Sequence, residues 1–172
     1  MKAGLIARGL MALLVAGLVT GAFGCPYSFT GASVPPHLKT VAIPLVEDQS
    51  GIGEPGLRER VTTELTNLFI SDNSLEVTDR SSADAILEGV VVTITDAPSV
   101  IEQGEQVRGR RVTLTARFVM KDMKLRKTMW EKTFTNWGDY DSGGGLSQRQ
   151  TGLNEAIRKV TEDVLLEAVS GW

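Results

Sequence analysis

Cysteine and histidine are almost missing from this chain of 172 residues, which has one of each, Cys25 and His37. A single cysteine excludes a disulfide within the chain. His37 has no second histidine or spare thiol to join it, so a zinc site or a histidine-based catalytic triad is disfavoured. We expect His37 to be a solvated loop residue beside Pro36.

The chain also lacks an excess of positive charge. It has 18 Lys and Arg against 21 Asp and Glu, which gives a formal net charge of −3. Proteins that bind duplex nucleic acid neutralise phosphates with clustered Lys and Arg, so this balance argues against a nucleic-acid partner. Any site for an anion must therefore be local.

The first 24 residues have the layout of an export signal. Lys2 and Arg8 precede a stretch from residue 9 to residue 24 that holds no charged residue and many small ones. A buried helix of this length would be expected to show a polar face. A retained transmembrane anchor is the other alternative, but the strongly apolar part, residues 10–19, is short against the roughly 20 residues that a bilayer core requires.

Cys25 follows this segment directly, in the sequence "AFGC". In bacterial lipoproteins the signal is cut just before a cysteine that then receives lipid. Gly24 and Cys25 match such a cleavage site, whereas Ala22 stands where a large aliphatic residue is usual and Phe23 where a small one is usual. We expect a covalent diacylglycerol and N-acyl lipid on Cys25 and no other cofactor; the alternative is a plain cleaved signal with an incidental thiol.

Cleavage before Cys25 would leave 172 − 24 = 148 residues, a usual size for one domain, with a net charge of (18 − 2) − 21 = −5. Residues 25–39 are rich in turn formers, and the two prolines near their end favour a semi-rigid extended path. We therefore predict a signal peptide over 1–24, a lipidated extended tether over 25–39 and a single α+β domain over 40–172.

The domain shows two amphipathic helices and several strands. Pro55 and Gly56 open a helix whose apolar residues are Leu57, Val61, Leu65, Leu68 and Phe69, and a second helix is predicted over 146–169. Strands are predicted over 40–46, 75–79, 83–95, 111–121 and 128–137. Pro44 must lie at the end or the edge of the first strand, because proline donates no ladder hydrogen bond.

The alternation between Arg111 and Lys121 is regular, with apolar residues at every second position. This pattern predicts a strand with one buried and one largely wet face. The connections among the last three strands are short enough for antiparallel pairing. The fold class is therefore predicted to be α+β, a two-layer sandwich with a mixed or antiparallel sheet of four to five strands and both helices on one face.

Candidate catalytic and metal-binding residues are few. Asp139, Asp141 and Gly143 imitate the start of a calcium loop, but the twelfth position is Gln150, where a bidentate glutamate is needed. We interpret this segment as a strand-to-helix connection. The carboxylates of the first helix, such as Glu59 and Glu64, have basic or polar neighbours and indicate a solvent face. The sequence therefore predicts no metal site and no enzyme activity.

Two basic clusters remain as candidate anion sites. The first, in "QVRGRR", holds Arg108, Arg110 and Arg111, which we place in the connection between the third and fourth strands. The second, in "KDMKLRK", holds Lys121, Lys124, Arg126 and Lys127. Arg and Lys can both bind phosphate, but either cluster could equally be an ordinary charged hairpin turn. If consecutive strands are antiparallel, the two clusters lie at opposite ends of the sheet.

The order of segments resembles a known family. The start "CPYSFTG", the stretches "HLKTVAIP" and "ADAILEG", and the terminal amphipathic helix are similar to the lipopolysaccharide-assembly lipoprotein LptE of Gram-negative bacteria, in its form outside the enteric group. The similarity covers essentially the whole chain after Cys25, with Pro26 standing where glycine is expected. None of these motifs is a catalytic signature.

This resemblance implies a non-enzymatic lipoprotein on the periplasmic side of the outer membrane, anchored through Cys25 and seated inside the β-barrel LptD. It also implies help in barrel assembly and binding of lipopolysaccharide. For the phosphates of lipid A we favour Arg108, Arg110 and Arg111, because three guanidinium groups in four positions concentrate bidentate donors. Lys124, Arg126 and Lys127 are the secondary candidates.

A second resemblance leads to another class of protein. The sequences "VA-x-P" and "AD-x-x-L-x-G" also occur in the amino-terminal domain of TolB and in CsgG, which would make the chain a periplasmic scaffold or secretion lipoprotein. CsgG-type chains are longer and build a pore, which a chain of this length would struggle to do alone. A large β-barrel partner would favour the first class, and a self-assembled ring the second.

Overall fold

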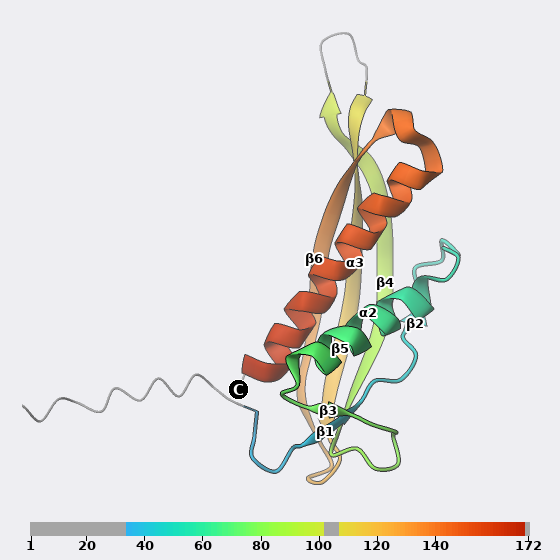
Figure 1. The fold of residues 1–172 in the computed structure, drawn as a ribbon. Helices are drawn as coiled ribbons and strands as arrows, with labels where there is room; N and C mark the ends of the chain where they lie inside the picture. The colour runs from blue at the N-terminus through green and yellow to red at the C-terminus, as the bar shows by residue number, and fades with distance from the viewer. Residues whose placement is uncertain (1–33, 102–106, 171–172) are drawn as a thin grey trace, which may run out of the picture. The chain divides into compact units, whose positions relative to one another are not determined.

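Three long antiparallel strands form most of the sheet. The computed structural model describes residues 34–101 and 107–170. Within them β4 (Ala85–Ile101), β5 (Val107–Asp122) and β6 (Lys127–Asp141) pair in chain order, so that Leu114 of β5 lies between Ile94 and Asn136. Figure 1 shows these strands extending well beyond the short ones at the edge. The β4–β5 and β5–β6 connections therefore lie at opposite ends, as predicted.

Three short strands complete a sheet of six. β1 (Thr40–Ala42) runs parallel to both β3 (Glu76–Val77) and β4, and β2 (Glu47–Asp48) pairs separately with β4. The order is β3-β1-β4-β5-β6. One strand was expected over 40–46, but β1 ends at Ala42, before Pro44, which lacks the N–H that a continuous ladder needs. β2 begins only at Glu47, after the predicted stretch. The sheet is mixed, as predicted, with more strands than the four to five expected.

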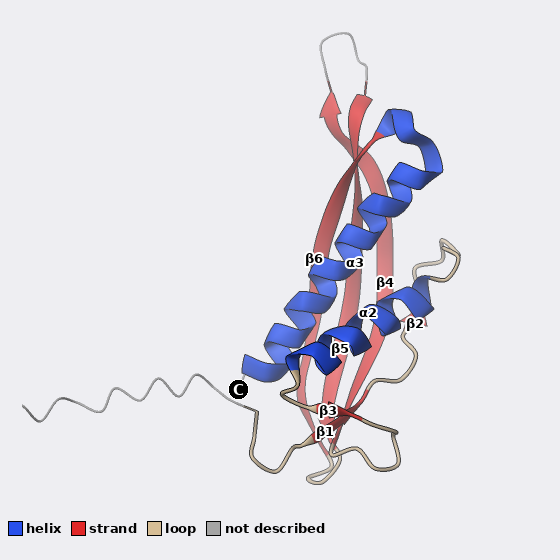
Figure 2. Cartoon of the chain, in the orientation of Figure 1, coloured by secondary structure: helices blue, strands red, loops and turns tan. Residues whose placement is uncertain are grey.

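Both helices cover the same face of the sheet, as predicted (Figure 2). α2 spans Leu57–Asp72 and buries Leu57, Val61, Leu65 and Phe69, one residue per turn. It is followed by the cap residue Asn73, which is left-handed and whose N–H donates to the carbonyl of Phe69 at 3.0 Å. α3 spans Gly145–Ser170 after a short 3-10 turn, η2 (Ser142–Gly144). Its buried residues include Leu153, Ile157, Val160, Val164 and Ala168.

The core lies between the helices and one face of the sheet. Every second residue of β5 from Val112 to Met120 is fully buried there, as the alternation predicted. Phe118 contacts the ring of Phe134 edge to face, at 6.2 Å between centroids. A Cβ added at Gly89 would lie 2.4 Å from the Phe118 ring, so glycine is required for this ring to pack over β4.

α3 approaches β6 very closely where two glycines meet. A Cβ added at Gly138 of β6 would lie 2.0 Å from the carbonyl oxygen of Gly152 in α3. Both glycines are buried. Because a backbone carbonyl cannot move aside as a long side chain can, any larger residue at Gly138 would push the helix off the sheet.

The opposite face of the sheet carries polar side chains and no helix. Thr113, Thr115 and Arg117 of β5 point to this face, because they alternate with the core residues. Thr115 shares a hydrogen bond of 3.0 Å with Thr135 on β6. This open face gives the sheet the wet side that the sequence predicted.

The packed domain begins before β1. The described residues belong to one compact unit, Ala32–Trp172. Leu38 is only 2% exposed and is part of the core. The amide of Lys39 donates to the carboxylate of Asp84 at 2.7 Å. Residues 34–39, which we expected to belong to an extended tether, are therefore held against the sheet.

Candidate functional site

Arg110 and Arg111 of the arginine cluster lie on one strand, β5, and point to opposite faces of the sheet. The structure places Arg110 and Arg111 inside β5, paired with Pro98 and Ala97 of β4, so their predicted position in the connection is wrong. Neighbouring residues of a strand point to opposite faces. Arg110 points to the helix face and Arg111 to the open face, while the side chain of Arg108 lies outside the described residues. The described arginines thus do not converge on one ligand.

Arg110 belongs to an ion network formed by Glu54, Asp96, Arg110, Tyr140 and Arg149. Its Nε lies 2.9 Å from both Asp96 Oδ1 and the Tyr140 hydroxyl. The Tyr140 hydroxyl donates to Asp96 Oδ2 at 2.7 Å, and Arg149 Nε donates to the same oxygen at 3.1 Å. Arg149 also reaches Glu54 at 2.8 Å. Three strands, α3 and the loop before α2 are tied together in this way.

The ion network shifts the pKa values of its members. Burial raises the pKa of Asp96, but the hydrogen bonds from Tyr140 and Arg110 outweigh it and hold that pKa below the ordinary value of 3.8. The pKa of Tyr140 is raised by burial and by its hydrogen bond to Asp96. Asp96 is therefore a carboxylate held ionised between two guanidinium groups, an arrangement that stabilises structure and leaves Arg110 no free donor fork.

Arg111 makes a separate ion pair on the open face. Its Nε and Nη2 donate to the two oxygens of Asp139 at 2.7 and 2.9 Å, and its guanidinium lies 4.8 Å from the centroid of the Trp137 ring. The hydrogen bonds from Arg111 lower the pKa of Asp139 below its ordinary value. Asp139, which imitated a calcium ligand in the sequence, is thus the partner of an arginine.

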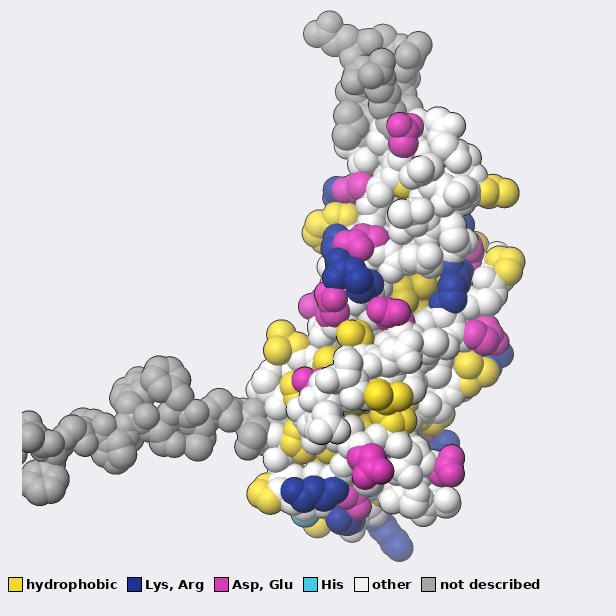
Figure 3. Space-filling model, in the orientation of Figure 1, with side chains coloured by type: hydrophobic (Ala, Val, Ile, Leu, Met, Phe, Trp, Pro, Cys, Tyr) yellow, Lys and Arg dark blue, Asp and Glu magenta, His cyan; other side chains and the backbone are white. Residues whose placement is uncertain are grey.

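The second basic cluster lies at the opposite end of the sheet, at the β5–β6 turn. Lys124 pairs with Asp84 at 2.8 Å and donates to the carbonyl of His37 at 2.7 Å. Lys121 pairs with Glu88 at 2.6 Å. Arg126 and Lys127 are exposed, and no described residue forms an ion pair with either of them. The lower end of Figure 3 shows dark blue basic side chains gathered here, with yellow apolar ones among them.

His37 is bound in place and does not extend into solvent as expected. Its Nε2 lies 2.6 Å from Oδ2 of Asp122, a carboxylate that is only 1% exposed. The other oxygen of Asp122 accepts the N–H of Leu125 at 2.7 Å. Burial raises the pKa of Asp122, but these two hydrogen bonds outweigh it and lower the pKa below 3.8. A charged group this deeply buried is kept only when it is paired, so Asp122 requires its partners.

A small hollow of about 180 Å³ lies beside this pair. Its lining includes Pro35, His37, Leu125, Lys127 and Met129. It mixes apolar walls with one free ammonium group. The start of the domain and the β5–β6 turn therefore share one surface.

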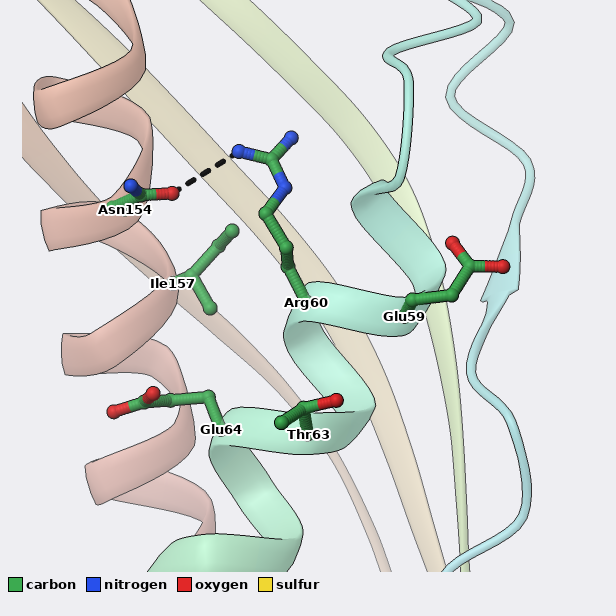
Figure 4. Close-up of a pocket in the computed structure, with 6 residues that line it drawn as sticks. All are labelled: Glu59, Arg60, Thr63, Glu64, Asn154 and Ile157. Atoms are coloured by element: carbon green, nitrogen blue, oxygen red, sulfur yellow. Dashed lines mark hydrogen bonds between the residues drawn. The ribbon is translucent and has the colours of Figure 1, made fainter.

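A wider and shallower groove runs between α2 and α3. Figure 4 shows Arg60 of α2 and Asn154 of α3 reaching toward each other across it, joined by a hydrogen bond of 3.0 Å. Its volume is about 400 Å³, and Glu59 and Glu64 also line it. The side chains of Glu59 and Asn154 are exposed, and those of Arg60 and Glu64 are half-buried. Among the described residues no hydrogen bond or ion pair positions either glutamate as acid–base catalysis requires.

The other motifs from the sequence have structural explanations. Asp141 accepts the N–H of Gly143 at 2.7 Å and so begins the η2 turn. Among the described residues no three His, Cys, Asp or Glu side chains gather as metal ligands. In the same part of the chain, none of the helices combines the length and the apolar character that a bilayer crossing demands. Cys25 lies outside the described residues.

Sequence reasoning missed the ion network and the His37–Asp122 pair. Asp96 and Tyr140 lie far apart in the chain and become neighbours only through the register of β4, β5 and β6. The signal that could have found them is alternation: Tyr140 and Arg110 are on the core side of their strands, where an isolated charge must be compensated. Asp122 continues the buried series of even-numbered residues in β5 in the same way.

Comparison with solved structures shows which proteins have a similar fold. Solved structures of similar fold include a PelC dodecamer from Paraburkholderia phytofirmans (TM-score 0.54, 13% identity, 80% of this chain and 92% of that chain). A minor lipoprotein from Acinetobacter baumannii is also similar, with a TM-score of 0.52, 15% identity and coverage of 80% of this chain and 94% of that chain. Lipoprotein B from Nitrosomonas europaea is similar as well, with a TM-score of 0.54, 11% identity and coverage of 86% of this chain and 92% of that chain. At these identities the likeness shows the fold alone, one shared with several bacterial lipoproteins.

The family follows from the sequence model that matches the chain. The model of the LptE family, described as lipopolysaccharide assembly, matches residues 38–167. This chain therefore belongs to the LptE family of lipopolysaccharide-assembly proteins. None of the curated proteins matches the sequence significantly. The matched range covers the folded domain from Leu38, the first core residue, into the last turn of α3.

Proposed function

We propose that the protein is an outer-membrane lipoprotein that assists lipopolysaccharide transport and assembly as the partner of an LptD-type β-barrel. Family membership over residues 38–167 is the observation that carries this proposal. The export segment and Cys25 supply the anchor on the periplasmic side. Intact-mass analysis of the native protein tests the anchor. An acylated chain that begins at Cys25 is expected, and an unmodified Cys25 contradicts it.

The open face of the sheet is suited to the interior of a barrel. Outer-membrane barrels have polar, water-filled interiors, and this face presents the hydroxyls of Thr115 and Thr135 and the ion pair of Arg111 with Asp139. A plug in such a lumen needs hydrogen-bonding groups more than apolar area. A pull-down from detergent-solubilised envelopes tests the partner: a large β-barrel protein should remain bound, and its absence under mild detergent would argue against this role.

For lipopolysaccharide itself, the proposal keeps Arg108, Arg110 and Arg111 as the phosphate-binding candidates. The ion pairs of Arg110 with Asp96 and of Arg111 with Asp139 mean that a phosphate must compete with an internal carboxylate. Replacing all three arginines with alanine should weaken lipopolysaccharide binding, and unchanged affinity would exclude this cluster. The matched variant replaces Lys124, Arg126 and Lys127, the secondary candidates.

A periplasmic scaffold of the TolB or CsgG kind is the second candidate. The observation that favours it is the similar fold of PelC, which forms a dodecamer. Native mass spectrometry of the detergent-extracted protein separates the two proposals. A ring of identical chains would support the scaffold, whereas a one-to-one complex with a barrel would support the LptD partner. Neither role requires catalysis, and we propose that the protein is not an enzyme.

A further inference from the structure

The β5–β6 turn presents apolar side chains to solvent. Its four residues, Met123–Arg126, form what is called here the basal turn. Met123 is 42% exposed and Leu125 is 58% exposed. Two large apolar side chains within one tight turn are more than solubility favours at a hairpin tip, where charged and small residues are usual.

Free positive charge surrounds these apolar side chains. Arg126 and Lys127 are exposed and without an ion-pair partner among residues 34–101 and 107–170. The nearby acids are already committed, since Asp84 pairs with Lys124, and Asp122 holds His37 and Leu125. The basal turn therefore combines two apolar side chains with two unneutralised cations.

The basal turn is also held rigidly in this exposed conformation. The N–H of Met123 donates to the carbonyl of Asp84 at 2.8 Å, and the N–H of Leu125 donates to Asp122 at 2.7 Å. Lys124 holds the turn to the segment before β1 through the carbonyl of His37. These hydrogen bonds hold the backbone of the turn from both sides in the conformation that exposes Met123 and Leu125. A preorganised loop also loses little entropy when it binds.

We infer that the basal turn is a second membrane contact, which places Met123 and Leu125 in the interfacial region of an anionic phospholipid bilayer. Arg126 and Lys127 would lie at the level of the phosphates. Apolar side chains that enter the acyl boundary beside cations that face anionic headgroups are the features of interfacial membrane binding. Charge complementarity and the fixed exposure of the turn carry this inference.

The length of chain between Cys25 and the domain agrees with this inference of a second membrane contact. Pro35, which lines the hollow beside the basal turn, is ten residues after Cys25. At roughly 3.5 Å per residue, an anchor at Cys25 keeps this surface within about 35 Å of the bilayer. The inference shares the lipid anchor with the proposed function, but a probe on the basal turn reports on the turn alone.

The experiment places an environment-sensitive bimane label at position 125 in the full acylated chain, through Leu125→Cys. The parent chain, whose only cysteine is Cys25, gives the background labelling. The labelled protein is reconstituted into vesicles of phosphatidylcholine alone or with phosphatidylglycerol, both free of lipopolysaccharide. Quenching by nitroxide lipids and by a water-soluble quencher reports depth. Leu146→Cys, on a residue 84% exposed at the start of α3, is the matched control.

Lipid quenching at position 125 and not at position 146 is the expected result, and it should be strongest with phosphatidylglycerol. Adding Arg126→Gln and Lys127→Gln should lower the equilibrium constant for docking about 25-fold, since each cation near an anionic surface contributes roughly fivefold. Arg117→Gln with Lys132→Gln, which removes two paired cations elsewhere, should leave docking unchanged.

Equal exposure to the water-soluble quencher at positions 125 and 146 in both vesicle types would overturn the inference. Protection of position 125 only after a barrel protein is added would also overturn it, and would assign the basal turn to a protein interface. Cys25 acylation is measured separately by mass, so failure of the anchor and failure of the docking contact are distinguishable.

Discussion

The two ends of β5 differ in whether all of their described basic side chains have an acidic partner. Near its start, Arg110 is enclosed in the ion network with Asp96, Tyr140 and Arg149. Beyond its end, Arg126 and Lys127 have no acidic partner among the described residues. α3 passes over one face of the first end, so Arg110 is enclosed there and must be paired, whereas the basal turn extends past both helices (Figure 1).

The difference teaches that basic residues in a sequence are not equivalent candidates for binding an anion. A guanidinium that already satisfies an internal carboxylate must break that pair before it binds a ligand. A free ammonium or guanidinium at a turn loses only hydration. The first end is accordingly built for stability, and the second for contact with something outside the domain.

The largest effect is expected where α3 packs on β6 at the first end. Gly138→Ala should lower the free energy of unfolding by about 3 kcal/mol, because the new methyl group meets the backbone of Gly152. Urea denaturation of the full chain measures it. Gly143→Ala is the control, since its Cβ would meet only Asp141 Oδ1 at 3.2 Å. Equal stability of the two variants would contradict the close approach.

Asp96→Asn should have the next largest effect and lower the free energy of unfolding by about 2 kcal/mol. The substitution leaves Arg110 and Arg149 facing each other without the carboxylate that compensates both. Asp139→Asn removes a carboxylate from the exposed pair with Arg111, and its denaturation midpoint should be close to that of the parent. If the two substitutions cost the same, the contrast between the covered and the open face fails.

At the other end of β5, Asp122→Asn should lower the free energy of unfolding by about 1.5 kcal/mol near neutral pH. Because the pKa of Asp122 is lowered in the folded state, its carboxylate stabilises the fold above its ordinary value of 3.8, and this contribution is lost as pH falls through the lowered pKa. The difference in the free energy of unfolding between parent and variant should therefore become smaller below about pH 4. Asp79→Asn, at an exposed carboxylate, is the control. A difference for Asp122→Asn that stays constant with pH would contradict this prediction.

The smallest effect is expected at the free cations themselves. Arg126→Gln with Lys127→Gln should change the free energy of unfolding by less than about 0.5 kcal/mol, because neither side chain pairs with a described residue. Thermal unfolding checks this. A larger loss would mean that these cations serve the fold, and would remove the distinction between the two ends of β5.

The periodic parts of the sequence predicted the structure well. Alternation from Val112 to Met120 gave the buried face of β5, and the helical spacing of Leu57, Val61 and Leu65 gave α2. These patterns succeed because burial on one face leaves a direct trace in the order of residues. The fold class and the placement of both helices on one face follow from the same traces.

The extent of the long strands was predicted less well. β4 continues to Ile101, past its predicted end at Thr95, and β5 begins at Val107, before its predicted start at Arg111. The added residues pair through backbone hydrogen bonds, which any sequence can form, so no local pattern marks them. For this reason Arg110 and Arg111 were expected in a loop. The ion network depends on the pairing register, which local pattern does not encode.

β6 is the outer strand of the sheet, and its free side is a template about 50 Å long to which another strand could add. The ammonium group of Lys159 in α3 occupies one of its acceptors, the carbonyl of Trp137, at 3.0 Å. α3 thus covers one of the acceptors of this edge. Loss of this contact would open that carbonyl to pairing with another strand.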